Sequence, residues 1–124
     1  MRFVRGHRVQ RIFQAAAWLL AVAIVVLSLV PPSYRPTSDI ASQSFEHLAT
    51  FLALGTAFGL GYANRFWILA GALVAFSGGI EIAQLWAPGR HARLSDFLVD
   101  AAAACIGIGL SRALMKLRDA TIGR

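Results

Sequence analysis

The chain has 124 residues, of which 57% are hydrophobic, and its mean hydropathy is +0.62. This composition excludes an ordinary water-soluble domain and predicts one compact membrane-embedded unit with the lipid bilayer as its first partner. The formal net charge of +6 is compatible with nucleic acid. However, the lysines and arginines flank apolar runs instead of gathering on a water-exposed face, so we expect no nucleic-acid partner.

Residues 13–30 form the first predicted membrane span, a charge-free run that is close to the roughly 20 residues a helix needs to cross about 30 Å of hydrocarbon. The basic residues before it also fit a secretory signal peptide. The apolar run is long, however, and no small-residue cleavage pattern follows it, so we expect the segment to be retained. Pro31 and Pro32 then end the helix and open a polar loop.

Three further spans are predicted at about 47–63, 66–86 and 94–114, and their short connections imply antiparallel neighbours. The fold class is therefore all-α: a single domain, residues 1–124, built as a bundle of four transmembrane helices. Small residues allow close helix contacts in lipid, either within the bundle or through self-association, so the oligomeric state stays open. These small residues include Gly55, Gly59 and Gly107.

The distribution of Lys and Arg predicts the orientation of the spans. Nine of the 12 lie in the N-terminal tail, the 64–65 turn or the C-terminal tail, and three lie on the other side of the predicted bundle. Basic residues near span ends are retained in the cytoplasm, so we expect both termini to be cytoplasmic. The loops at 31–46 and 87–94 should face outward. Cys105, the only cysteine, permits no intramolecular disulfide and no cysteine-based metal site.

Costly polar groups concentrate between the third and fourth spans. Glu81 and Gln84 share one helix face, and Glu81 lies about five residues inside the predicted end of its span. A charge in a membrane interior costs about 2.5–3.5 kcal/mol, so the carboxylate needs a partner or a wet cavity. A purely structural ion pair with Arg90 is the alternative to a role in binding or chemistry.

Asp96 and Asp100 share one face of the fourth helix. Asp96 is also explained by the helix dipole, because it lies in the first turn, whereas Asp100 lies deeper. His47, at the start of the second span, is suited to act as acid, base or ligand, although a lone histidine there is more often only interfacial. Because three spans converge, we expect one polar cluster at the outer face, with the Arg90 guanidinium bridging two carboxylates. Its expected members are His47, Glu81, Gln84, Arg90, Asp96 and Asp100.

Three segments, "HLATFLALG", "EIAQLWAPGR" and "SDFLVDAAAACIGIGL", together resemble the VanZ-like family of small bacterial membrane proteins. The resemblance covers about residues 44–110, and all expected cluster members except Asp100 fall on family positions. Two departures stand out. Gln43 and Ser44 replace an Asp-Lys pair that members often place before the histidine, and Asp100 replaces an Asn. A role that requires that lysine does not carry over to this chain.

The resemblance implies a multi-pass protein of the bacterial cytoplasmic membrane that serves the cell envelope, because the founding member is linked to teicoplanin resistance. It implies no reaction, so the catalytic residues are unknown. We expect binding or handling of an envelope component or glycopeptide-type drug, with an anionic or sugar-bearing ligand at the outer face. The alternatives are a membrane-embedded hydrolase or phosphatase acting on lipid-linked substrates, and ion or proton transport. No cofactor or metal-spacing motif is present in the sequence.

Overall fold

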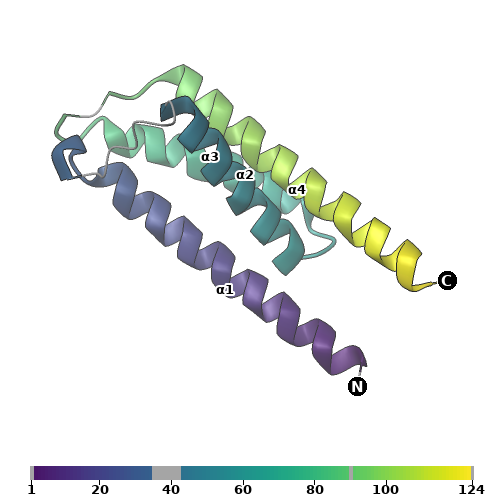
Figure 1. The fold of residues 1–124 in the computed structure, drawn as a ribbon. Coiled ribbons are helices and arrows are strands. Elements are labelled where there is room, and N and C mark those ends of the chain that lie inside the picture. Colours follow the sequence, from purple (N-terminus) through teal and green to yellow (C-terminus); the bar gives the residue numbers. More distant parts are fainter. Residues whose placement is uncertain (1, 35–42, 90, 124) are drawn as a thin grey trace.

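The computed structural model describes residues 2–34, 43–89 and 91–123, and these form a bundle of α-helices with no strand (Figure 1). Consecutive helices run in opposite directions, so both chain termini lie at one end. We call the opposite end, which carries residues 85–89 and 91–93 and the start of the second helix, the distal end. The all-α prediction is confirmed. The elements are α1 (Arg2–Leu29), the short 3₁₀ turn η1 (Pro32–Tyr34), α2 (Gln43–Gly61), α3 (Phe66–Gln84) and α4 (Leu94–Ile122).

Three of the helices are long and apolar enough to cross a membrane: residues 6–29 of α1, all of α3 and all of α4. Trp67 and Trp86 mark the two ends of α3 with exposed indole rings. At 1.5 Å per residue they are separated by about 28 Å along the axis, which matches the thickness of a bilayer core. Tryptophan gathers at membrane interfaces, so these two residues indicate where the hydrocarbon begins and ends.

Two helices continue well past the spans that were predicted from the sequence. α1 begins at Arg2, and α4, expected to end near residue 114, reaches Ile122. A charge sets the edge of the hydrocarbon layer but does not stop a helix, because Arg and Lys are good helix formers. The Arg112 guanidinium lies 4.8 Å from the Phe66 ring centroid, at the level of Trp67, and α4 continues beyond it as a basic segment.

Helices α2 and α4 touch through their backbones. A Cβ on Gly55 would overlap the Ala104 backbone, and one on Gly107 would stand 2.7 Å from the Thr56 nitrogen. A Cβ on Gly59 would stand 2.7 Å from the Ser111 Cβ atom. The expectation that these glycines lie at helix contacts is therefore confirmed, and it is the α2–α4 contact that they serve.

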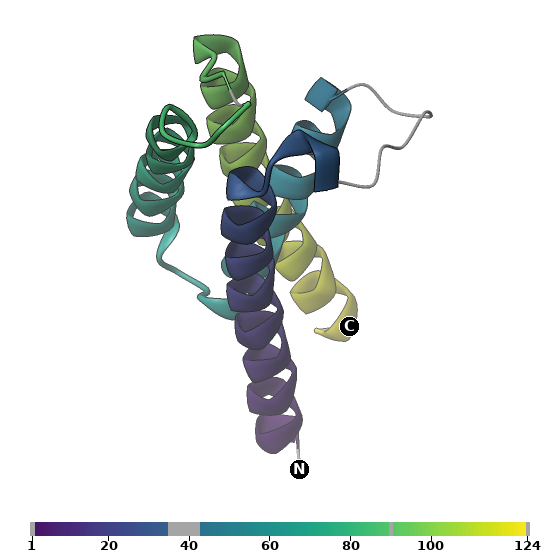
Figure 2. The same cartoon turned by 90° about the vertical axis from the view of Figure 1, so that its left-hand side faces the viewer.

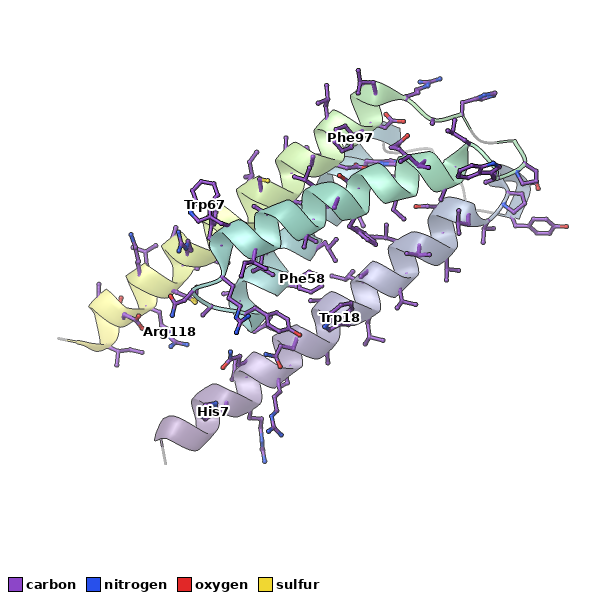
Figure 3. All side chains as sticks on the ribbon, turned by 180° about the vertical axis from the view of Figure 1, so that it is seen from behind. His7, Trp18, Phe58, Trp67, Phe97 and Arg118 are labelled. Carbon is purple, nitrogen blue, oxygen red and sulfur yellow. The ribbon has the colours of Figure 1, made fainter. Side chains whose placement is uncertain are left out.

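Helix α1 is fixed to the end of α2 by polar side chains. The Gln10 and Gln14 side-chain amides donate hydrogen bonds of 3.1 and 2.8 Å to the carbonyl oxygen of Gly61. This carbonyl belongs to the last turn of α2, where backbone acceptors lack helical partners. Nearby, the Trp18 ring meets the edge of Phe58 at 5.4 Å, as the two labelled side chains in Figure 3 show.

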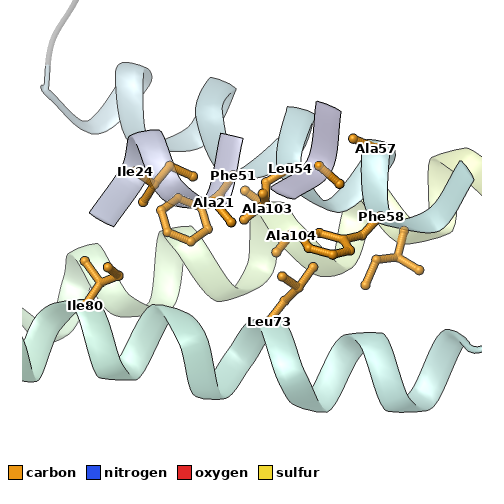
Figure 4. Packing of buried hydrophobic residues seen from close by; sticks show 12 residues of the cluster. Ala21, Ile24, Phe51, Leu54, Ala57, Phe58, Leu73, Ile80, Ala103 and Ala104 are labelled. Atoms are coloured by element: carbon orange, nitrogen blue, oxygen red, sulfur yellow. The ribbon is translucent and has the colours of Figure 1, made fainter. Parts of the chain in front are cut away.

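Helix α4 lies between α2 and α3, which pack on opposite sides of it (Figure 2). The apolar core fills the space that remains. Leu73 and Ile80 project from α3 toward Phe51 on α2 and Ala21 on α1 (Figure 4). The buried hydroxyls of Ser77 and Ser111 are satisfied within their own helices, because they donate to the carbonyls of Val74 and Ile108 at 2.9 and 2.6 Å.

Candidate functional site

Five of the six side chains singled out in the sequence lie at the distal end. His47 lies in the first turns of α2, Glu81 and Gln84 lie in the last turn of α3, and Asp96 and Asp100 lie in the first two turns of α4. Because these three helix ends meet there, we refer to the five residues as the distal polar cluster. Arg90, the sixth expected member, lies outside the described residues, so its predicted bridge between two carboxylates stays a prediction.

His47 and Asp100 are in direct contact. The His47 Nδ1 atom lies 3.1 Å from both carboxylate oxygens of Asp100. The Asp100 side chain is fully buried, and that of His47 is 11% exposed. A carboxylate oxygen accepts, so Nδ1 carries the hydrogen. This fixes the tautomer of a neutral His47 and leaves its Nε2 atom without a hydrogen-bond partner among the described residues.

Glu81 is held on one side only. Glu81 is 7% exposed. Its Oε2 atom accepts a hydrogen bond of 3.0 Å from the backbone N–H of Arg93, the residue that precedes α4. The carboxylate thereby takes up a donor at the positive end of the α4 dipole. The other oxygen, Oε1, is buried and has no partner among the described residues. An unsatisfied buried polar group costs about 1–3 kcal/mol, and more when it is charged.

Gln84 and Asp96 complete the cluster. Gln84 is 4% exposed, so its side-chain amide is buried beside the carboxylates of the cluster. Asp96 is partly buried in the first turn of α4, where the helix-dipole explanation also holds. The charges of Asp96, Asp100 and His47 all act on Glu81, so the titratable members share one electrostatic environment.

Sequence reasoning did not single out the partners that the structure shows for the two buried carboxylates. It expected the Arg90 guanidinium to pair with Glu81 and with at least one of the aspartates, and this pairing stays a prediction; the described contacts are those of Asp100 with His47 and of Glu81 with the Arg93 backbone. The Arg93 side chain is exposed, as expected of an interfacial residue, so only its N–H belongs to the site. No side-chain pattern identifies a backbone donor, because every residue except proline carries one.

A shallow hollow at the same end of the bundle is not part of the cluster. It is lined by Leu29 of α1 and by Ile82, Trp86 and their neighbours, which occupy the face of α3 that points away from Glu81. The lining is apolar and suits lipid chains. Within the described ranges, no three His, Cys, Asp or Glu side chains are arranged to hold a metal ion.

The family model described as VanZ/LLP1 matches residues 3–116. The chain belongs to the VanZ/LLP1 family. The match reaches beyond residues 44–110, which carry the motif resemblance, and includes nearly all of α1. No curated protein and no solved structure matches the chain.

In this VanZ/LLP1-family protein, the acidic residue at position 100 has a structural consequence. An asparagine would offer one neutral oxygen to His47, whereas Asp100 offers two charged ones. Hydrogen bonds to ionised acceptors are about twice as strong as neutral ones. Asp100 therefore fixes the histidine more firmly than an asparagine would. Chemically, the cluster combines an oriented imidazole, a buried amide, and a carboxylate oxygen that has no protein partner among the described residues.

Proposed function

We propose that this VanZ/LLP1-family protein binds an envelope component or a glycopeptide-type drug through its distal polar cluster, at the outer face of the bacterial cytoplasmic membrane. The observation that carries the proposal is the Oε1 atom of Glu81, a buried acceptor without a partner among the described residues. A protein that only needed to join three helices would gain stability from an apolar side chain at this position. A ligand that donates to Oε1 explains why the carboxylate is there.

The proposed orientation places the cluster outward. Both chain termini lie at the end opposite the cluster, and the basic residues of the α1 and α4 extensions lie there as well. Cytoplasmic retention of this basic end would put the distal end in the outer leaflet. Glu81 would then lie about 7.5 Å below the outer interface, five helical residues from Trp86.

Complementation of a deletion strain tests the proposed function. Glu81→Gln preserves the size of the side chain and removes its charge, so it should abolish rescue in glycopeptide-sensitivity or envelope-stress assays. Asp119→Asn makes the same chemical change on an exposed residue at the opposite end and should rescue normally. Both variants must accumulate to the wild-type level in membranes. Full rescue by Glu81→Gln at that level would contradict a functional role for the cluster.

The His47–Asp100 contact favours one second candidate, a membrane-embedded hydrolase or phosphatase that acts on lipid-linked substrates. An imidazole that donates from Nδ1 to a buried carboxylate, and whose Nε2 has no hydrogen-bond partner among the described residues, is arranged as a general base for water. Turnover of a lipid-linked diphosphate that is lost in His47→Gln would establish this function, whereas binding without turnover favours the first. Transport has no such support, because the buried hydroxyls of Ser77 and Ser111 donate to their own helices and do not continue the cluster.

A further inference from the structure

We propose that the distal polar cluster recognises a primary ammonium group, an inference that rests on the binding function proposed above and specifies its ligand. The ammonium would donate to Glu81 Oε1 and lie among the other carboxylates of the cluster. Two kinds of molecule present such a group at the outer leaflet: a lipid with an ethanolamine headgroup and a soluble aminosugar.

The balance of donors and acceptors in the cluster favours a ligand that donates. Glu81 Oε1 and the Asp96 carboxylate accept only, and the Nε2 atom of a neutral His47 also accepts. Among the described side chains of the cluster, only two carry N–H groups: His47, whose Nδ1–H is donated to Asp100, and Gln84. An ammonium carries three N–H donors and no acceptor, so it complements this set.

The charges favour the same ligand. The described members comprise three carboxylates and one imidazole, and the aspartate charges act on Glu81. A phosphate or carboxylate placed against Glu81 would be repelled, most strongly in a partly buried site where the effective dielectric constant is low. Of the two ligand types expected from the sequence, anionic and sugar-bearing, the sugar-bearing type fits when it carries an amine. A zwitterionic lipid also fits, because its ammonium can enter while its phosphate stays at the interface.

Burial limits the size of the group that can enter. Glu81 and Gln84 are 7% and 4% exposed, so only a small group such as an ammonium could reach the Oε1 atom of Glu81. A trimethylammonium group has the same charge, but it is larger and has no N–H to donate. Choline and ethanolamine headgroups therefore form a matched pair for testing the inference, and so do glucose and glucosamine.

Ligand-dependent stability of the full-length protein in a neutral maltoside detergent provides the test. Dihexanoyl phosphatidylethanolamine or glucosamine should raise the thermal unfolding midpoint in a saturable manner, whereas dihexanoyl phosphatidylcholine and glucose should not. A response to only one of the two amines identifies the source as lipid or soluble molecule. Glu81→Gln should weaken the apparent affinity about 10- to 100-fold, the loss expected for one hydrogen bond to a charged group. Asp119→Asn should retain wild-type affinity.

A second variant guards against misfolding of the first. Glu81→Gln should fold, because it removes a buried charge that lacks a full set of partners. Asp96→Asn changes a partly exposed residue and should weaken the affinity for the amines less than Glu81→Gln does. Equal responses to ethanolamine and choline headgroups, no response to either amine, or an unchanged affinity in both variants would overturn the inference. If the amines raise the unfolding midpoint only after Arg90→Ala, the arginine side chain supplies the positive charge that we assign to the ligand. This result would also overturn the inference.

The outcomes also separate this inference from the function on which it rests. Binding of glucose or of an anionic lipid that is lost in Glu81→Gln would overturn the ammonium ligand and leave the binding function standing. Full rescue of the deletion strain by Glu81→Gln would overturn both.

Discussion

The His47–Asp100 contact gives a quantitative test of how the distal end is held together. His47→Ala removes the partner of a fully buried carboxylate. Removing the partner of a buried charge in this way costs about 3–5 kcal/mol, because the charge of Asp100 is left uncompensated. Asp100→Asn keeps an oxygen that accepts the Nδ1 hydrogen bond and removes the charge, so its cost should be about 1 kcal/mol.

The double variant should distinguish a coupled pair from two independent contacts. His47→Ala with Asp100→Asn leaves no unpaired charge at position 100, so it should be more stable than His47→Ala alone. The free energies of unfolding can be measured by SDS titration in mixed micelles, with helicity followed by circular dichroism. Costs that simply add, or a His47→Ala cost below about 1 kcal/mol, would refute the reasoning, because contacting residues that depend on each other are non-additive.

Two predictions concern packing and topology. Gly59→Leu should lower the thermal stability of the bundle by about 1–3 kcal/mol or prevent its accumulation, because the new side chain would collide with Ser111, whereas Gly71→Leu, which points into open space, should be tolerated. Equal stability of these two variants would contradict the close α2–α4 contact. Ser33→Cys in a Cys105→Ala background should react with a membrane-impermeant thiol reagent applied outside intact cells, and exclusive labelling from the cytoplasmic side would reverse the proposed orientation.

The fold could be predicted because its signals are local. Runs of apolar residues near 20 in length, interrupted by Pro31 and Pro32 and by short polar connections, predict the number and order of the helices. Gly55 and Gly59 are spaced by about one helical turn, which likewise predicted a contact surface on this helix. In the structure this surface of α2 faces α4. The helix ends differed from the predicted spans because hydropathy locates the bilayer edge, and helix ends depend on local propensity instead.

The cluster could be predicted only in part, because its pairings are not local. Depth and helical periodicity directed attention to Glu81 and Asp100, and both are buried in the structure. Their partners depend on how the helices are arranged: His47 is 53 residues from Asp100 in the chain, and the Arg93 N–H reaches Glu81 through the path of the backbone. Choosing the nearest opposite charge in the sequence could identify neither of them.

The two buried carboxylates differ in how fully the protein satisfies them, and this difference changes which one is expected to meet a ligand. Asp100 was the stronger functional candidate of the two aspartates in the sequence because of its depth, yet both its oxygens contact His47. Glu81 uses one oxygen and leaves the other without a partner among the described residues. Satisfied buried groups stabilise a fold, whereas an unsatisfied one costs stability until something binds it. Asp100→Asn should therefore reduce stability more than ligand affinity, and Glu81→Gln should do the reverse.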